Sequence, residues 1–313
     1  MRDLQRRLGA AGFTPDENEA SMFGDATAAS LRDFQQVRGL RVTGACDEQT
    51  WLALIEAGWK LGDRLLVLTA PQLRGDDVST LQTMMSRIGF DCGRPDGILG
   101  PGTTTALTDF QRNSGLTADG ICGPKSVGAL ELAGRQSGSG PGVASVRESA
   151  TLSTGDGSLA TLRLVIGQFG GLSAIARSTA RVLRERGATV MSTDEYEATA
   201  QAAAANRFGA GAYVGFEAVA EPTSTVSYFA VPAFESIGGR ALAIRMTDEL
   251  SRVLATPPTL QGMRLPVLRE TRMPAVLCLL GPVRDVVDST DEISAAIVRA
   301  MGGWTGGATH RLD

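Results

Sequence analysis

The sequence predicts a multi-domain protein in which two small all-α repeats, each of three helices, are followed by an α/β domain with a mainly parallel or mixed sheet. Three observations lead to this prediction. Residues 1–133 contain one pattern twice, residues 134–159 are rich in Gly, Ser and Thr, and residues 160–302 alternate apolar strands with amphipathic helices.

The internal repeat consists of six short motifs that recur in the same order. The offset is 77 residues for the first two motifs and 76 residues from Phe34 onward. The spacing predicts three short helices in each copy, at 1–57 and 78–133. The motifs are Leu4-Gln5, Gly12-Phe13, Phe34-Gln35, Gly39-Leu40, Gly44 and Leu54, and their counterparts are Leu81-Gln82, Gly89-Phe90, Phe110-Gln111, Gly115-Leu116, Gly120 and Leu130.

Each copy needs a tight loop and a small core. In the second copy, Gly97 and Gly100 allow positive φ, and Thr103 is placed to cap the next helix. Leu107 and Phe110 lie three residues apart on one helical face, and we expect them to pack with Leu81, Ile88 and Leu130. Between the copies, the connector 58–77 carries the apolar run 64–68, which we expect to pack the repeats together.

The carboxyl-terminal half is predicted to be an α/β domain at 160–302, with a flexible linker at 134–159 before it and a flexible tail at 303–313 after it. The predicted strands are Leu162–Ile166, Thr189–Ser192, Ala212–Phe216, Val226–Val231 and Ala275–Leu280. The predicted helices are Ser173–Arg186, Ala198–Phe208, Gly238–Leu254 and Ser289–Met301.

Composition excludes several classes of protein. Hydrophobic residues make up 43% and charged residues 20% of the chain, which is typical of globular domains. A net charge of −4 and 5% aromatic residues argue against a nucleic-acid partner, and no stretch reaches the length of a membrane span. Residues 1–12 form an amphipathic pattern rather than a secretion signal, so we expect a cytoplasmic protein; a missing leader would instead place it outside the cell.

The four cysteines do not have the spacing of a zinc site. Cys46 and Cys122 occupy equivalent repeat positions, which indicates small buried side chains. Cys92 and Cys122 are a candidate disulfide pair, and Cys278 is expected to be a buried thiol.

The loop 95–107 of the second copy resembles the Asp-Gly-x-Phe-Gly-x-x-Thr pattern of the peptidoglycan-binding domain family, with Asp96-Gly97 and Gly100 in place. The first copy keeps Phe23-Gly24 and Thr27, but has Glu19-Ala20-Ser21 where Asp-Gly is usual. This resemblance implies that peptidoglycan, or a muramyl-peptide precursor of it, is the ligand.

The segment 164–283 resembles the zinc-dependent N-acetylmuramoyl-L-alanine amidases. Their first strand ends in Asp-Pro-Gly-His-Gly-Gly, and Phe169 stands at the ligand histidine of that motif. Glu217 stands at the second ligand histidine, in the family's Ser-Ile-His-Ala-Asn. Leu279 stands at the acid/base glutamate of Pro-Ala-Val-Leu-x-Glu-x-Gly. The loop that carries a further ligand glutamate is missing before Ile175-Ala176.

These replacements change the chemistry that the resemblance implies. Zinc hydrolysis needs a metal that acidifies its water and a carboxylate that moves the proton, and Phe169 and Leu279 can do neither. The chain's one histidine is His310. We therefore predict a pseudoenzyme without a cofactor, in which Gln168 and Glu217 contact the ligand.

The domain order resembles cytoplasmic amidase-like proteins of actinobacteria that are linked to regulation of peptidoglycan synthesis, which implies a cell-wall synthesis enzyme as a partner. The alternative is an active zinc amidase whose ligands come from Cys278, Glu217, Asp194 or Glu195.

The tail suggests a second kind of partner. Thr305 and Thr309 lie in a Gly-rich stretch near Arg311, where a kinase could reach them. A phosphothreonine-reading protein would then be a partner, and the alternative is an unmodified end.

Overall fold

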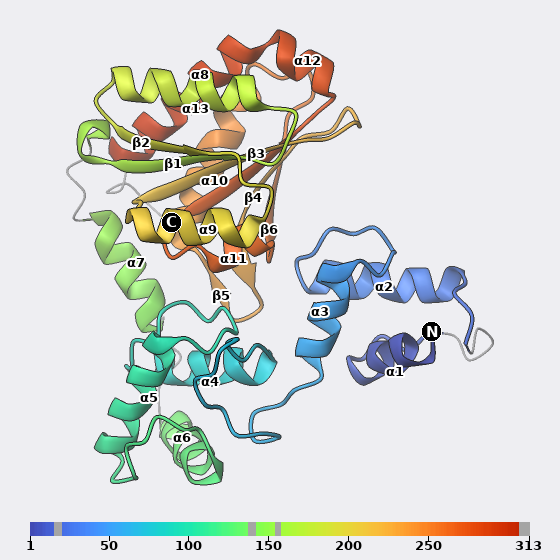
Figure 1. Cartoon of the computed structure of the whole chain (residues 1–313), viewed down its shortest axis with the longest axis vertical. Helices are drawn as coiled ribbons and strands as arrows, with labels where there is room; N and C mark the ends of the chain where they lie inside the picture. Colours follow the sequence, from blue (N-terminus) through green and yellow to red (C-terminus); the bar gives the residue numbers. More distant parts are fainter. Residues whose placement is uncertain (16–20, 137–141, 154–157, 307–313) are drawn as a thin grey trace. The chain divides into compact units, whose positions relative to one another are not determined.

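The computed structural model describes residues 1–15, 21–136, 142–153 and 158–306. The chain divides between Val146 and Arg147 into two compact units, a helical one and an α/β one (Figure 1). Both predicted fold classes are confirmed. Within the described residues, no helix is both long and apolar enough to cross a membrane.

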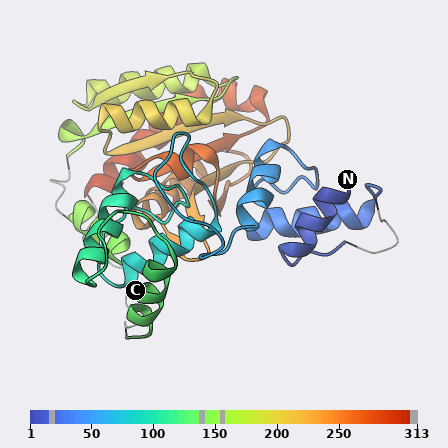
Figure 2. The ribbon, with the colours of Figure 1, turned by 60° about the horizontal axis from the view of Figure 1, so that its bottom comes forward.

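The helical unit contains the two predicted three-helix copies, and Figure 2 shows the first of them in blue. Each copy has its own buried core, and an edge-to-face pair of phenylalanines joins two of its motifs: Phe13 with Phe34 at 5.6 Å between ring centres, and Phe90 with Phe110 at 5.5 Å. The helices are α1 (Arg2–Ala10), α2 (Asp25–Val37), α3 (Glu48–Ala57), α4 (Asp76–Arg87), α5 (Pro101–Asn113) and α6 (Pro124–Gln136).

The glutamines of the repeated Leu-Gln and Phe-Gln motifs all have the same structural role. Each Oε1 accepts a hydrogen bond, at 2.8–3.0 Å, from the N–H of a loop residue whose φ is 71–74°. Each Nε2 lies 2.8–3.2 Å from the next carbonyl oxygen and from a Thr or Ser hydroxyl further along the chain. The four sets are Gln5 with Ser21, Met22 and Thr27; Gln35 with Gly44, Ala45 and Thr50; Gln82 with Gly97, Ile98 and Thr103; and Gln111 with Gly120, Ile121 and Ser126.

Ser21 is the exception in this scheme, because the other three sets have glycine at the left-handed position. Its φ is 72°, a conformation that costs a residue with a Cβ about 1 kcal/mol relative to glycine. We expect Ser21→Gly to raise the free energy of unfolding of the first repeat by about 0.5–1 kcal/mol. Urea denaturation should show this gain, and the reciprocal Gly97→Ser should lower the stability of the second repeat; a destabilising Ser21→Gly would contradict the argument.

The connector between the copies packs on the second repeat, which corrects the expectation that its apolar run joins the two. Leu66 is 1% exposed in the core of the second copy and forms an antiparallel bridge with Cys122, whereas its neighbours Leu65 and Val67 are exposed. The reason is that an extended segment buries only alternate side chains.

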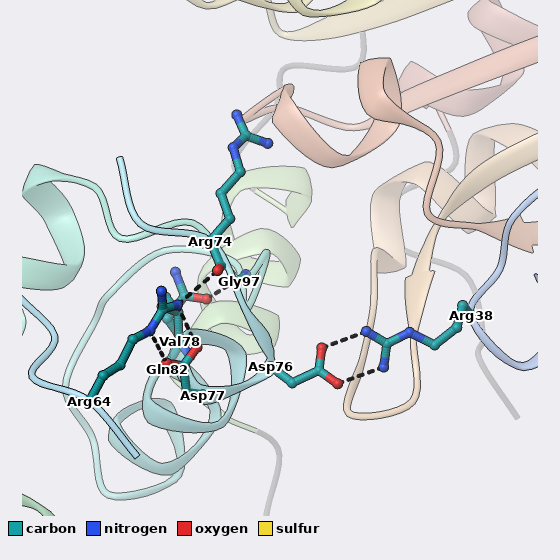
Figure 3. A network of polar contacts seen from close by, with 8 residues as sticks. All are labelled: Arg38, Arg64, Arg74, Asp76, Asp77, Val78, Gln82 and Gly97. Atoms are coloured by element: carbon teal, nitrogen blue, oxygen red, sulfur yellow. Dashed lines mark hydrogen bonds and ion pairs between the residues drawn. The ribbon is translucent and has the colours of Figure 1, made fainter. Parts of the chain in front are cut away.

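Two ion pairs hold the first turn of α4, where the second repeat begins (Figure 3). Arg64 donates to both carboxylate oxygens of Asp77, at 2.7 and 3.2 Å, and to the Arg74 carbonyl at 2.8 Å. Asp77 has a 1% exposed side chain, so this pair is largely withdrawn from water. Arg38 of the first repeat makes two parallel bonds to Asp76, at 2.5 and 2.7 Å, and these tie the first repeat to the first turn of α4.

The four cysteines are free thiols, so the candidate Cys92–Cys122 disulfide is not formed. The Cys92 thiol instead donates to the Gln82 carbonyl at 3.2 Å. Burial raises the pKa of Cys92 to about 12 and that of Cys122 to about 11, so both are neutral at physiological pH.

The predicted linker contains a helix, which corrects its assignment as flexible throughout. Helix α6 continues to Gln136 and α7 spans Val143–Ser153, while 137–141 and 154–157 lie outside the described residues. Ala144 is buried, and its N–H donates to Ser86 Oγ in the helical unit. In the α/β unit, Glu148 accepts hydrogen bonds from Ser236 Oγ and Ile237 N. Tertiary contacts therefore outweigh the Gly- and Ser-rich composition here.

The α/β unit has a seven-stranded mixed sheet with the order β2-β1-β3-β7-β4-β5, and β6 pairs with β4. Pairing is parallel from β2 through β7 and between β4 and β6, and antiparallel between β7 and β4. The strands are β1 (Arg163–Gln168), β2 (Thr189–Thr193), β3 (Ala212–Ala218), β4 (Thr225–Val231), β5 (Phe234–Glu235), β6 (Thr259–Met263) and β7 (Ala275–Leu280).

Helices cover both faces of this sheet (Figure 1). One large core lies between the sheet and α8 (Ser173–Glu185), α10 (Ile237–Leu250) and α13 (Thr290–Gly306). Helices α9 (Ala198–Phe208) and α11 (Pro266–Glu270) contact each other, and α12 (Val283–Asp288) precedes α13.

The predicted tail is helical at its start, which corrects its boundary. Helix α13 runs to Gly306, and Trp304 is 7% exposed with its Nε1 donating to the Gly238 carbonyl at 3.2 Å. Burial of an indole that also has a hydrogen-bond partner stabilises the helix beyond the predicted end at Met301.

Candidate functional site

The three family positions singled out from the sequence lie at the carboxyl ends of three neighbouring parallel strands. Glu217 of β3 pairs in register with Leu279 of β7. Gln168 of β1 pairs with Phe216, and the next N–H, that of Phe169, donates to the Phe216 carbonyl at 2.9 Å. Phe169, Glu217 and Leu279 therefore form one row across the sheet, which we call the edge row, and each is half-buried.

The edge row faces the side of the sheet that carries α9. Its strand neighbours Phe216 and Cys278 point into the core beneath α8, α10 and α13, and successive residues of a strand point to opposite faces. In an open α/β sheet, the carboxyl edge of the parallel strands is where ligands bind. The structure thus brings the sequence-predicted residues to a place suited to a ligand.

A buried network of hydrogen bonds holds this edge of the sheet in place. Gln201 of α9 and Tyr213 of β3 are both fully buried, and the Tyr213 hydroxyl donates to Gln201 Oε1 at 2.6 Å. Gln201 Nε2 donates to the carbonyls of Gln168, at 2.9 Å, and Glu195, at 2.6 Å. The network fixes the ends of β1 and of the segment after β2, and burial raises the pKa of Tyr213, which keeps its hydroxyl a proton donor.

Two glycines make room for this network. A Cβ on Gly167 would lie 2.1 Å from Gln201 Oε1 and 2.4 Å from the Tyr213 hydroxyl. A Cβ on Gly215 would lie 2.9 Å from both the Tyr213 hydroxyl and Leu277 Cδ1. Neither Gln201 nor Tyr213 belongs to a predicted site motif; the available signal was one glutamine in the alanine-rich stretch 198–205.

The Gln168 side chain belongs to the turn after β1. Its Oε1 accepts from the Gly170 N–H at 2.7 Å, and Gly170 and Gly171 have φ of 103° and 77°. The Gln168 side chain is therefore already hydrogen-bonded within the turn, and its contact with a ligand stays a prediction.

The side chains of the edge row do not fit the zinc that the amidase resemblance implies. Of the three, only Glu217 has an atom able to bind a metal, whereas a protein zinc site uses several nitrogen, sulfur or oxygen ligands. Across the described ranges, no group of three or more His, Cys, Asp or Glu residues is placed to hold a metal ion.

The ligands considered for the active alternative do not converge. Cys278 points to the opposite face of the sheet, where its thiol donates to Met246 Sδ at 3.9 Å, and burial raises its pKa to about 12. Asp194 and Glu195 are exposed at the end of β2, on the far side of β1 from β3. The residue His310 lies outside the described residues.

The two candidate phosphorylation sites differ in their placement. Thr305 lies in the last turn of α13, half-buried, and its Oγ1 donates to the Gly302 carbonyl at 3.0 Å. Thr309 lies outside the described residues, as does Arg311.

Comparison with known proteins agrees with this architecture. The model of the putative peptidoglycan binding domain matches residues 1–54 and 74–130, one match for each three-helix copy. The helical unit thus consists of two tandem repeats that are similar to the putative peptidoglycan binding domain.

The curated relatives that the chain matches include proteins named as N-acetylmuramoyl-L-alanine amidases. It is 38% identical, over 178 residues, to "N-acetylmuramoyl-L-alanine amidase CwlM" of Mycobacterium tuberculosis, which covers 53% of this chain and 43% of that protein. It is 32% identical, over 142 residues, to a probable N-acetylmuramoyl-L-alanine amidase of Bacillus licheniformis, covering 40% of each. The chain thus spans less than half the length of either relative.

Among solved structures, the amidase Ami1 of Mycobacterium smegmatis aligns with 48% of this chain and 99% of its own, at 15% identity and a TM-score of 0.41. The catalytic domain of the amidase CwlV aligns with 45% of this chain and 96% of its own, at 18% identity and a TM-score of 0.36.

Proposed function

We propose that this protein binds peptidoglycan or a muramyl-peptide precursor without cleaving it, and regulates cell-wall synthesis through that ligand or through a protein partner. The observation that carries the proposal is the edge row. In the sequence resemblance to the amidases, these positions correspond to two zinc ligands and the acid/base carboxylate, and here they hold Phe169, Glu217 and Leu279.

The chemistry of these side chains supports binding rather than hydrolysis. Hydrolysis of an amide by an amidase of this kind needs an activated water and a group that protonates the leaving amine. A phenyl ring and an isobutyl group supply neither function, but they offer apolar surface to the lactyl and alanyl methyl groups that adjoin the amide bond. Glu217 adds one carboxylate, which can accept hydrogen bonds from the N–H groups of a peptide.

The two repeats support the choice of ligand. Each copy matches the putative peptidoglycan binding domain and keeps a complete three-helix fold with its own core. A second unit with a site for the muramyl peptide would then let the protein contact the same polymer or precursor at two places.

The test is the metal content of the full-length protein, measured by elemental mass spectrometry, together with release of stem peptide from muropeptides. A zinc amidase with the complete ligand set serves as the positive control. We expect less than stoichiometric zinc and no release, with muropeptide binding retained. Stoichiometric zinc with turnover would overturn the proposal and establish the alternative, an active zinc-dependent N-acetylmuramoyl-L-alanine amidase.

A further inference from the structure

The second repeat has a surface groove beside helix α5. It has a volume of about 430 Å³, within the range of small-ligand sites, and lies between the loop after α4 and the exposed side of α5. It is lined by Gly89, Phe90, Asp91, Thr105, Ala106, Asp109, Arg112 and Asn113.

The groove has an apolar floor and a charged rim. Phe90 is held in place by its edge-to-face contact with Phe110, and Ala106 is buried beside it. The rim carries two carboxylates and one guanidinium, from Asp91, Asp109 and Arg112. A ligand that matches this rim carries at least one cationic group and one anionic group close to a small apolar part.

Ion pairs with a ligand can replace the ion pair between Arg112 and Asp109 on the rim. Arg112 and Asp109 are joined at 2.6 Å, but their side chains are 64% and 51% exposed. An ion pair this exposed contributes little to stability, so opening it costs little. A ligand ammonium placed on Asp109 and a ligand carboxylate placed on Arg112 would replace one ion pair by two.

The first repeat provides an internal comparison. It keeps the frame of the groove, with Gly12 and Phe13 at the positions of Gly89 and Phe90, and Asp33 at the position of Asp109. The other polar groups differ: Thr14 stands for Asp91, Gln36 for Arg112 and Val37 for Asn113. The shared fold therefore does not demand the charged rim.

We propose that this groove of the second repeat binds a stem peptide at the side chain of a diamino acid whose ammonium and carboxylate are both free. The inference rests on the proposed function, because it takes the peptide part of peptidoglycan as the ligand. The two copies would then differ in function. The second would recognise the charged side chain of the diamino acid, whereas the first has no guanidinium at the position of Arg112.

Isothermal titration of the full-length protein tests the proposal. The probe is a soluble disaccharide-tetrapeptide whose diamino acid has a free amine and a free carboxylate. The double variant Arg112→Gln with Asn113→Val gives the second copy the residues of the first at these two positions, and we expect it to raise Kd about tenfold or more. Arg135→Gln removes another exposed arginine of the same repeat, outside the groove lining, and should leave Kd unchanged.

Chemical changes of the probe separate recognition from general loss of charge. Amidation of the diamino acid carboxylate should weaken binding to the unaltered protein but have no further effect on Arg112→Gln. Acetylation of its amine should act in the same way with Asp109→Asn. Equal Kd values for the double variant and the unaltered protein would overturn the inference while leaving the proposed function in place, and no binding of the probe to the unaltered protein would overturn both.

Discussion

Gly167→Ala is expected to lower the free energy of unfolding of the α/β unit by about 2–3 kcal/mol, the range of an overpacked core. The added Cβ would lie 2.1 Å from Gln201 Oε1 and 2.4 Å from the Tyr213 hydroxyl. Both atoms end side chains that are 0% exposed, so they cannot move into solvent. Any shift that relieves the clash breaks the hydrogen bonds from Gln201 to the strand and loop carbonyls. Thermal or urea unfolding followed by circular dichroism measures the loss.

Two further variants make this prediction specific. Gly302→Ala adds the same methyl group in α13, where the nearest atom would be 3.9 Å away, and should be neutral or stabilise by up to about 1 kcal/mol. Gly167→Ala should also cost less in a Gln201→Ala background, because one of the clashing atoms is then gone. Additive effects of the two substitutions would show that the clash with Gln201 is not the cause.

Gln35→Ala is expected to destabilise the first repeat by about 2–4 kcal/mol, because it leaves buried loop groups without their partners. The Gln35 side chain is 0% exposed. It accepts from the N–H groups of Thr43 and Gly44, at 2.9 and 2.8 Å, and lies 2.8 Å from the Ala45 carbonyl. Urea denaturation of the full-length chain, with a probe in the first repeat, measures the change.

The adjacent residue provides the control. Gln36 is on the same helix but exposed, so Gln36→Ala should change stability by no more than about 0.5 kcal/mol. Gln35→Met keeps most of the side-chain volume while removing the hydrogen bonds. If Met restored full stability, packing rather than hydrogen bonding would be the role of this glutamine.

The sequence predicted most of the fold because its signals are local and repeated. The paired motifs located all six helices of the repeats, and apolar runs located five strands of the sheet. Strand β6 was missed because the alternation at Thr259, Leu260 and Gln261 spans only three residues, all of them exposed, and no apolar run marks the strand. Helix α7 was missed because Gly and Ser dominate its surroundings, while the Glu148 contact that holds it depends on residues nearly 90 positions away.

The candidate site was predictable only in part, for a related reason. Motifs at strand ends placed Phe169, Glu217 and Leu279 together, because parallel strands end at one edge. The hydrogen bond from Tyr213 to Gln201 joins strand β3 to helix α9, and neither residue belongs to a sequence motif. The hydrogen bond from the Gly170 N–H to Gln168 Oε1 was not predictable, because it depends on the conformation of the turn after β1.

We expect the hydrogen-bonding glutamines to make each three-helix repeat a single folding unit. Helix α2 presents Thr27 to Gln5 on α1, and presents its own Gln35 to Thr50 on α3. Helix α5 does the same, with Thr103 facing Gln82 and Gln111 facing Ser126. Each middle helix makes these hydrogen bonds with both of its neighbouring helices, so any two helices of a repeat lack some of the bonds that stabilise them. We therefore expect cleavage of either loop to unfold all three helices. Limited proteolysis should therefore release whole repeats and no stable two-helix fragment.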